Sequence, residues 1–394
     1  MGAYFHSYIN TAQNILSSYK FEQPFYVFLK SFFKRNKKYG SRDRKVISNL
    51  CFSFFRIGDA ANSLDFHDQV IVGYFLTHDY DNGLLSVLKS DWVDAANSSL
   101  VDKIELVKVS FPDFNEKKLF PGIELISNGI DEKSMEFHHF HQPDFFIRVR
   151  PGKRKLIEKR LIENNISFKS IGDVAIKVAA GVDLNGLIEI DKDAVVQDLS
   201  SQGTIDYFPF FNESQISIWD ACAGSGGKSI MSADIYRNCR LYVSDIREDI
   251  LDELARRFTS AGISPISLFC TDLQQSLSKQ VVDAHLPDGG VDLIIADVPC
   301  TGSGTWGRSP EWLKGFDLSL IDAYQSRQKN ILTQLPIHLK PNGYLLYITC
   351  SVFRQENEEV TDSFKTLSGL KLIKQGVVHQ QGGDYLFAAL FRKE

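Results

Sequence analysis

From about residue 200 onwards, short apolar runs alternate with segments of helical pattern. Regular alternation of this kind is typical of an α/β domain with a doubly wound, mostly parallel sheet and helices on both faces. Ligands of such sheets bind outside the carboxyl ends of the strands, so functional residues are expected directly after each strand. The strands are expected at 216–220, 241–245, 266–270, 291–296 and 344–349.

The first expected strand runs directly into a glycine-rich turn. The strand ends at Asp220, and the turn continues as Ala-Cys-Ala-Gly-Ser-Gly-Gly-Lys-Ser to Ser229. Glycines here let the backbone turn tightly and approach a ligand at the start of a helix. The spacing differs from that of the phosphate-binding GxxxxGK[ST] loop, so a nucleoside triphosphate is disfavoured, and a glycine turn alone is a weak signal.

Acidic residues follow the next two strands. Asp245 ends the second strand about 20 residues after the turn, where a carboxylate typically accepts ribose hydroxyls. Asp272 follows the third strand and is placed to reach an adenine amino group. Together with Asp220, these acids stand at three successive strand ends. They indicate a cofactor that contains adenosine.

Two cysteines follow the last two strands. Asp297-Val-Pro-Cys300 comes after 291–296, and Cys350 comes after 344–349. A deprotonated thiol is a strong nucleophile, which makes Cys300 a candidate for covalent chemistry, although a buried thiol that only packs is the alternative. The second cysteine at a neighbouring strand end favours chemistry, because two thiols would converge on one crevice.

The region before residue 200 has a different sequence pattern. Residues 1–140 carry apolar side chains at helical spacing and predict an all-helical domain. Residues 141–200 predict a small α/β domain, and residues 201–394 the doubly wound domain. Within the small domain, strands are expected at 145–150, 175–178 and 187–190, and a charged helix at 153–164.

Three clusters of polar residues lie in these two regions. Lys34–Lys45 holds seven basic residues and one acid, and it either contacts RNA phosphates or forms a solvated turn. In the small domain, a second basic group either contacts RNA or only bridges two domains, and RNA contact is favoured. Its residues are Arg148, Arg150, Lys153, Arg154 and Lys155. A surface turn without a metal is expected for His138, His139 and His141, because no cysteine or acid stands at ligand spacing.

Composition narrows the class of protein. The chain has 394 residues, 43% of them hydrophobic and 24% charged, and no apolar run long enough to span a bilayer. Six widely spaced cysteines without a CxxC pair suggest neither a disulfide framework nor a zinc site. No signal sequence opens the chain, so a cytoplasmic protein is expected. The net charge of −5 confines any nucleic-acid contact to local patches.

Four segments resemble, in order, the motifs of the Sun/Nop (RsmB-like) family of RNA 5-methylcytosine methyltransferases. The family patterns DxCAxPGGK, DAPCSGxG, RxPE and TCSxxxxEN are met by Asp220–Lys228, Asp297–Gly304, Arg308–Glu311 and Thr349–Asn357. The resemblance is strong over 195–394 and looser for a NusB-type helical domain and a small RNA-binding domain before it. The departures, none of which removes a reacting group, are Gly224-Ser225, Val298 and Trp306-Gly307.

The resemblance implies a Rossmann-like class I methyltransferase that moves a methyl group from S-adenosylmethionine to carbon 5 of an RNA cytidine. In this family Cys350 would add to carbon 6 and Cys300 would release the product, while Asp297 holds the base edge and Lys228 positions the base or Asp297. No metal is implied. The expected cofactor-binding residues are Asp220, Cys222, Ala223, Gly224, Gly226, Gly227, Lys228, Asp245, Arg247, Asp272 and Asp297.

The expected partner is ribosomal RNA, and the protein is expected to be a monomer. The target cytidine is expected to be single-stranded or flipped, because a thiol cannot reach a ring inside a duplex. A DNA cytosine methyltransferase is disfavoured, since it needs no thiol at Cys350. A catalytically silent RNA-binding or ribosome-assembly factor would not need every reacting group. A cysteine hydrolase would need a histidine base, and only His338 lies near a cysteine in sequence.

Overall fold

The computed structural model of the chain describes residues 2–81, 83–179, 181–275 and 278–394. The chain forms two compact units, and each is described by itself. The helical unit contains Met1–Glu124, Asp131–Gln142 and Trp306–Leu318. The α/β unit contains Leu125–Ile130, Pro143–Thr305 and Ser319–Glu394.

The helical unit is built around a core rich in aromatic side chains, in which Phe25, Phe55 and Trp92 are buried. Helices α3 and α4 approach so closely that a Cβ at Gly73 would collide with the backbone of Ser53. The helices are α1 (Gly2–Ser18), α2 (Phe25–Arg35), α3 (Ser41–Arg56), α4 (Phe66–Thr77), α5 (Leu84–Leu88), α6 (Leu100–Ser110) and α7 (Glu132–His138).

The segment that follows the Cys300 loop belongs to this helical unit. Its short helix η6 (Pro310–Leu313) carries Glu311, whose Oε1 accepts a hydrogen bond from the backbone N–H of Phe25 at 3.0 Å. Arg56 donates to the carbonyl of Gly307 at 3.0 Å. Trp306 is only 1% exposed and packs against Phe120. The RxPE motif therefore helps to build the helical unit.

The histidine cluster differs from the expected surface turn. His139 is fully buried and stacks on Phe140, and Arg56 donates to its carbonyl. Burial lowers the pKa of His139 to about 3, so the ring is neutral at physiological pH. The expectation of a surface turn is wrong for His139, because its ring fills space in an aromatic core, whereas His141 is exposed. The described residues contain no group of three or more potential metal ligands.

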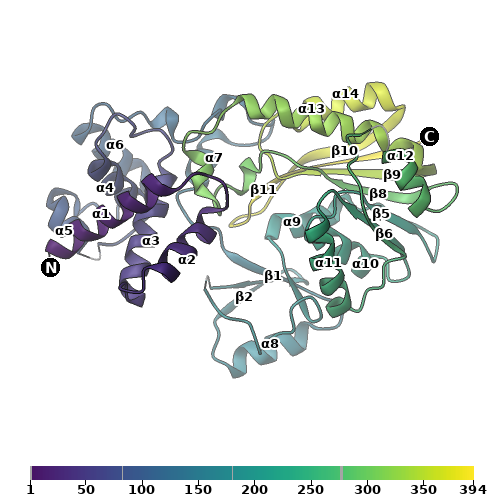
Figure 1. Cartoon of the computed structure of the whole chain (residues 1–394), viewed down its shortest axis with the longest axis horizontal. Coiled ribbons are helices and arrows are strands. Elements are labelled where there is room, and N and C mark those ends of the chain that lie inside the picture. The colour runs from purple at the N-terminus through teal and green to yellow at the C-terminus, as the bar shows by residue number, and fades with distance from the viewer. Residues whose placement is uncertain (1, 82, 180, 276–277) are drawn as a thin grey trace. The chain divides into compact units, whose positions relative to one another are not determined.

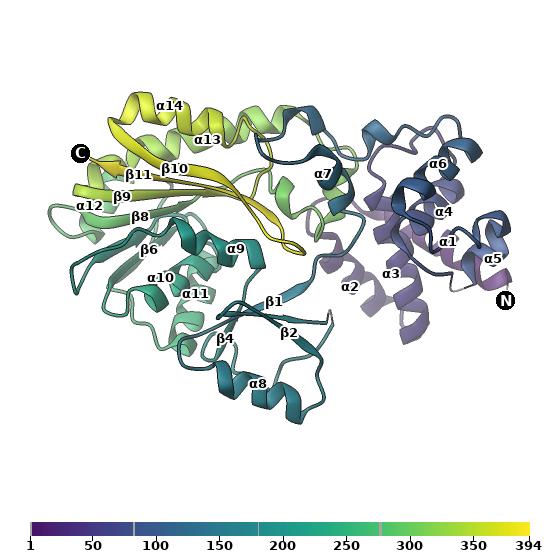
Figure 2. The ribbon, with the colours of Figure 1, turned by 180° about the vertical axis from the view of Figure 1, so that it is seen from behind.

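In the α/β unit, a four-stranded antiparallel sheet has the order β2-β3-β1-β4. Helix α8 (Arg154–Glu163) covers one face of it, as Figure 2 shows. Ile157 and Leu161 of this helix are buried in the small core. The strand expected at 187–190 is wrong: the amides of Leu187 and Ile188 bond to one carbonyl in a turn, and their apolar pattern serves burial in the small core. The strands are β1 (Phe145–Val149), β2 (Phe168–Ile171), β3 (Ala175–Val178) and β4 (Ala194–Val196).

The main sheet of this unit has seven strands in the order β10-β11-β9-β8-β5-β6-β7 (Figure 1). The five strands from β9 to β7 are parallel, and β11 pairs antiparallel with both β9 and β10. The strands are β5 (Ser217–Asp220), β6 (Arg240–Asp245), β7 (Ser267–Cys270), β8 (Val291–Asp297), β9 (Leu339–Thr349), β10 (Leu370–His379) and β11 (Tyr385–Lys393).

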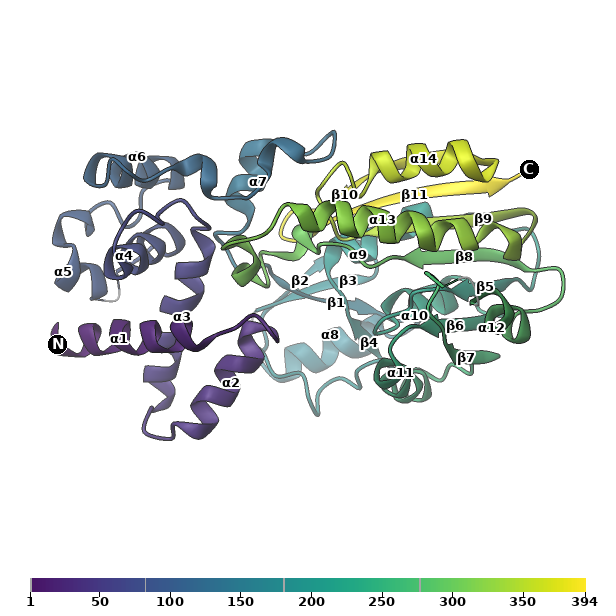
Figure 3. The ribbon, with the colours of Figure 1, turned by 45° about the horizontal axis from the view of Figure 1, so that its top comes forward.

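Helices cover both faces of this sheet, which confirms the doubly wound fold (Figures 1 and 3). Leu254 and Phe258 are buried against one face, and Leu332 and Phe364 against the other. No helix among the described residues is long and apolar enough to cross a membrane. The helices are α9 (Leu199–Gly203), α10 (Gly227–Ile235), α11 (Glu248–Ala261), α12 (Ser278–His285), α13 (Ser319–Gln334) and α14 (Glu358–Ser368).

Candidate active site

A cavity of about 660 Å³ opens at the carboxyl ends of the parallel strands. Its size falls in the range of small-molecule sites. Segments that follow all five parallel strands contribute to its wall, as expected for an open α/β sheet. Of the predicted residues, Cys222, Ala223, Gly224, Gly227, Lys228, Asp245, Arg247, Asp272, Asp297, Cys300 and Cys350 line it.

Two predicted cofactor residues do not line this cavity. Asp220 is fully buried, and its Oδ2 accepts a hydrogen bond from Ser229 Oγ at 2.5 Å. Burial raises the pKa of Asp220 to about 7. The Asp220 carboxyl therefore holds Ser229 in the first turn of α10 and does not line the cavity. Gly226 is needed for packing, because its φ is +82° and a Cβ would strike the Leu254 side chain.

Asp245 joins the turn after β5 to the turn after β6. Its carboxylate accepts hydrogen bonds from the backbone N–H of Gly224 at 2.8 Å and of Arg247 at 3.0 Å. Arg247 adds a bond from Nε at 3.1 Å. The side chain is largely buried but borders the cavity. The carboxylate is therefore held in one orientation at the place where ribose hydroxyls are expected.

The two cysteines meet in the cavity. Cys300 Sγ lies 3.1 Å from Cys350 Sγ, and the backbone N–H of Cys350 donates to Cys300 Sγ at 3.3 Å. Both thiols are free. The hydrogen bond with Cys350 and burial raise the pKa of Cys300 well above its usual range. Two thiols in contact do not ionise independently, so loss of a proton is a property of the pair.

Lys228 and Asp297 form an ion pair on the same wall. Lys228 Nζ lies 3.2 Å from Asp297 Oδ2, and the two side chains are 8% and 33% exposed. Lys228 is the second residue of α10, where the helix dipole disfavours a cation. The Asp297 carboxylate compensates for this cost and leaves one of its oxygens free of Lys228. A carboxylate fixed in this way can bind a donor edge of a ligand.

Sequence reasoning did not select Glu356, although it belongs to the TCSxxxxEN segment. Its buried carboxyl accepts hydrogen bonds from the N–H and the hydroxyl of Thr301 at 2.9 and 2.6 Å. It also accepts from Ser351 Oγ at 2.5 Å and from Gln328 Nε2 at 3.0 Å. Burial raises the pKa of Glu356. Thr301 and Ser351 each follow a cysteine directly, so one carboxyl ties both cysteine loops together.

Further cavity residues come from segments without a recognisable motif. Gln197 and Ser201 approach from the region of α9, and Arg327 from α13. Ser201 Oγ accepts a hydrogen bond from Lys228 Nζ at 2.9 Å. Serine and glutamine are common in loops and helix starts, so no sequence signal distinguished these two. Only the tertiary fold brings them to the cavity.

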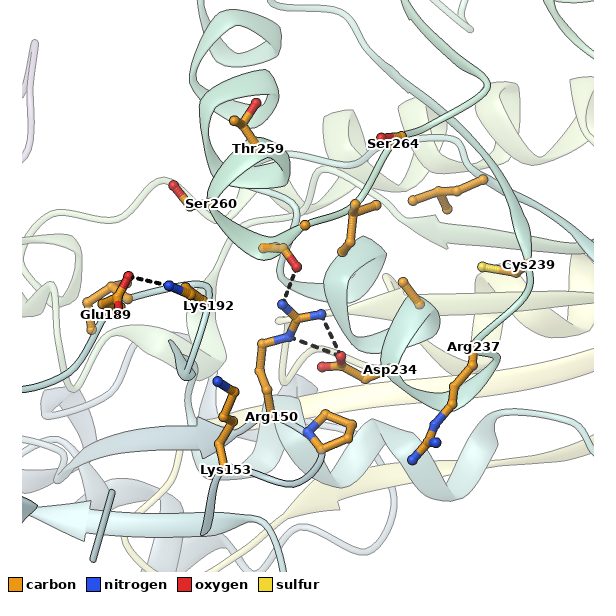
Figure 4. Close-up of a pocket in the computed structure, with 17 residues that line it drawn as sticks. Arg150, Lys153, Glu189, Lys192, Asp234, Arg237, Cys239, Thr259, Ser260 and Ser264 are labelled. Carbon is orange, nitrogen blue, oxygen red and sulfur yellow. Dashed lines mark hydrogen bonds and ion pairs between the residues drawn. The ribbon is translucent and has the colours of Figure 1, made fainter. Parts of the chain in front are cut away.

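A second cavity of about 940 Å³ lies near the amino ends of β6 and β7, and Figure 4 shows the side chains that line it. Arg150 bonds to Asp234 Oδ1 through Nε at 3.0 Å and NH2 at 2.8 Å. Arg148, only 4% exposed, bonds to Asp234 Oδ2 at 2.6 Å. The expectation of RNA contact is wrong for these two arginines, because both form ion pairs with Asp234 inside the unit.

Comparison with known proteins matches part of the chain to a family model and shows a fold. Residues 211–387 match the family model described as 16S rRNA methyltransferase RsmB/F. Ribosomal RNA small subunit methyltransferase B of Pasteurella multocida is 31% identical over 238 residues, which are 57% of this chain and 51% of that protein. The chain thus spans about half the length of this curated relative.

Two further matches complete the comparison. The tRNA (cytosine(72)-C(5))-methyltransferase NSUN6 of Mus musculus is 30% identical over 180 residues, 44% of this chain and 37% of that protein. The solved structure of PH0851 matches 98% of this chain and 97% of that chain, with a TM-score of 0.68 and 19% identity. That similarity shows a shared fold.

Proposed function

We propose that the protein methylates carbon 5 of a cytidine in RNA, with ribosomal RNA as the expected class. The match of residues 211–387 to the RsmB/F methyltransferase model supports this proposal. The observation that carries the proposal is the pair of thiols 3.1 Å apart in the cavity that also holds Asp297 and Lys228. One thiol can add to the base while the other assists its release.

The cavity residues suit S-adenosylmethionine, the cofactor of these methyltransferases. The volume of about 660 Å³ accommodates a ligand of this size. The fixed Asp245 carboxylate would hold the ribose hydroxyls, and Asp272 the adenine amino group. Gly224, with a φ of +52°, brings the backbone close to the ligand. When bound, the cofactor supplies an electrophilic methyl group.

Cys350 is the nucleophile in this proposal. Cys350 stands in the TCSxxxxEN segment directly after β9, the position of the attacking thiol in the motif that this sequence resembles, and it attacks as a thiolate. Its sulfur forms a bond to carbon 6 of cytosine, and the electron pair of the ring double bond moves toward carbon 5, which then takes the methyl group. A base then takes the proton from carbon 5, the electron pair re-forms the ring double bond, and the Cys350 sulfur leaves carbon 6 as a thiolate, which releases the product. Cys300, in contact with the Cys350 sulfur, assists this last step.

Asp297 and Lys228 prepare the base for attack. Asp297 would bind N3 and the amino group of cytosine and favour protonation as negative charge builds up in the ring. Lys228, at 3.2 Å from Asp297, orients the carboxylate and balances its charge. A base reached in this way must lie outside a duplex, so the target is a single-stranded or flipped cytidine.

Methyl transfer and bisulfite sequencing test this function together. The purified protein is incubated with tritiated S-adenosylmethionine and transcripts of small-subunit ribosomal RNA or of transfer RNA. In parallel, RNA from cells with and without the gene is sequenced after bisulfite treatment. We expect incorporation into one transcript and one cytosine that loses protection without the gene. A protein that binds RNA but changes no cytosine is the silent assembly factor instead.

We expect Asp245→Ala to weaken binding of both S-adenosylmethionine and its demethylated product about tenfold or more, because the bonds to ribose hydroxyls and to the Gly224 turn are lost. Titration calorimetry measures both affinities. Asp249→Ala is the matched control, since Asp249 is an exposed acid in the first turn of α11. Tight binding of a nicotinamide dinucleotide without affinity for S-adenosylmethionine would contradict the cofactor assignment.

The basic segment Lys34–Lys45 connects α2 and α3 and is largely exposed. We propose it as an RNA-contacting surface of the helical unit. Neutralising four of its residues should weaken RNA binding and reduce the slope of log K against log salt by about 3, because each phosphate contact releases counterions. Turnover at saturating RNA should stay unchanged. The four residues are Arg35, Lys37, Lys38 and Arg42.

Filter binding across a salt series measures the affinity and the slope. A control variant neutralises four exposed lysines elsewhere in the helical unit and changes the net charge equally. If both variants lose the same affinity, the effect is one of overall charge and the segment is a solvated turn. The control residues are Lys20, Lys117, Lys118 and Lys133.

A further inference from the structure

The hydroxyl of Ser201 has a defined hydrogen-bonding role on the wall of the active-site cavity. Ser201 lies in α9, whose first turn is capped by the Asp198 carboxylate through the N–H groups of Ser200 at 2.8 Å and Ser201 at 3.3 Å. Its oxygen accepts one hydrogen bond from Lys228 Nζ at 2.9 Å and another from Gln197 Nε2 at 3.2 Å. A hydroxyl oxygen has two acceptor positions, and both are occupied.

The direction of both bonds follows from the chemistry of the partners. The ammonium of Lys228 can only donate. The amide of Gln197 is oriented by Arg148, whose Nε donates to Gln197 Oε1 at 2.7 Å. A guanidinium also only donates, so the amide oxygen must face Arg148 and the amide nitrogen must face Ser201. Ser201 therefore accepts from both neighbours.

Buried ion pairs keep this arrangement from reversing. Arg148 is held at 2.6 Å by Asp234, and Asp234 is held on its other oxygen by Arg150, as the dashed lines in Figure 4 show for the second pair. Reversal of the Gln197 amide would place an N–H group against a guanidinium. That contact is repulsive, and burial makes it more costly.

The remaining proton of Ser201 points to a ligand. In the described part of the chain its hydroxyl donates to no acceptor, and Ser201 lines the cavity with Asp297, Cys300 and Cys350. Lys228 bridges Asp297 and Ser201, at 3.2 and 2.9 Å, so the two side chains stand side by side along the wall. An acceptor next to the edge that Asp297 binds would meet this proton.

Building on the proposed function, we propose that Ser201 donates a hydrogen bond to the carbonyl oxygen at carbon 2 of the target cytosine. That oxygen is the acceptor next to N3, which Asp297 is assigned to bind. Addition of the thiolate at carbon 6 moves negative charge onto N3 and this oxygen. A donor fixed there before the reaction binds the adduct more strongly than the free base, and thereby lowers the barrier to attack.

The first measurement compares Ser201→Ala with Ser201→Thr on an active transcript. We expect Ser201→Ala to lower kcat about 100-fold, the effect typical of a lost donor to developing charge. The affinity for S-adenosylmethionine should remain that of the parent. Ser201→Thr keeps a hydroxyl and should recover much of the rate. Ser200→Ala is the matched control, because Ser200 Oγ accepts from the backbone N–H of Gln380 and does not line the cavity.

A second measurement separates donation to the base from mere support of Lys228. The same transcript is made with 2-thiocytidine, whose sulfur is a poor acceptor at the position of the carbonyl oxygen. If Ser201 donates to that oxygen, replacing cytidine by 2-thiocytidine lowers kcat of the parent protein. The same replacement lowers kcat of Ser201→Ala only slightly, because that variant has already lost the hydrogen bond. If Ser201 only positions Lys228, the two losses multiply, and the proposal is overturned.

Different results would contradict the Ser201 assignment and the proposed function on which it rests. If the parent methylates cytidine and Ser201→Ala keeps the parental kcat, the Ser201 assignment is wrong and the function stands. If the parent forms 5-methylcytidine in no transcript while binding RNA, the function itself is wrong and the assignment falls with it.

Discussion

Cys350→Ala is expected to abolish both methyl transfer and the covalent adduct with RNA, a loss of at least about 10⁴-fold in rate. Without a thiolate at the end of β9, carbon 5 of the base is never activated. In Cys300→Ala, Cys350 should still attack the base and the methyl group should still be transferred. The RNA should then stay attached to Cys350, because the release step lacks its second thiol. Since the two sulfurs are 3.1 Å apart, position alone does not distinguish them, and the difference lies in the step that each one serves.

Denaturing gels of the protein mixed with labelled RNA and S-adenosylmethionine show the difference as a slowly migrating band for Cys300→Ala alone. Cys270→Ala serves as the control, because Cys270 is exposed and does not line the cavity. An enzyme of the DNA type would give the reverse pattern, with Cys300→Ala inactive and Cys350→Ala nearly active. Unchanged methylation in both variants would exclude covalent catalysis.

Glu356→Ala is expected to lower the free energy of unfolding by about 3 kcal/mol or more, because four hydrogen-bond donors lose the buried carboxyl that accepts from them. It should also lower kcat about 100-fold, since the loops that carry Cys300 and Cys350 are no longer held in one geometry. Chemical denaturation measures the stability, and single-turnover methylation measures the rate.

Glu356→Gln gives a sharper test of the same network. Glu356 Oε1 accepts from the N–H of Thr301 and from Gln328, whereas Oε2 accepts only from the hydroxyls of Thr301 and Ser351. A glutamine can place its oxygen at the first position and donate its amide N–H groups to the two hydroxyls, which can rotate to accept. We therefore expect stability and rate close to those of the parent.

Glu359→Ala is the matched control for this pair, because Glu359 is a half-exposed acid in the first turn of α14 and should change stability by less than about 0.5 kcal/mol. If Glu356→Gln were as damaging as Glu356→Ala, the carboxylate charge itself would be required. The role of Glu356 would then lie in chemistry and not in holding the loops.

The sequence was sufficient for the alternation of strands and helices and for the edge at which Asp297, Cys300 and Cys350 meet. Both depend on local pattern: parallel strands place their carboxyl ends together, so residues that follow different strands converge. The same local rule misjudged 187–190, because an apolar run of four residues serves a buried turn as well as a strand. It also misjudged Arg148 and Arg150, whose charge gave no sign that Asp234 would neutralise them.

Contacts between residues far apart in the chain were decided only by the tertiary structure. Burial of His139, the joining of two cysteine loops by Glu356, and the orientation of the Ser201 hydroxyl by Lys228 and Gln197 all depend on such contacts. Propensity and periodicity describe neighbours along the chain, whereas hydrogen-bond direction and burial are set by whichever distant group packs against a side chain. The sequence therefore determined which candidate reacting groups follow the strands, and the fold determined how they are held.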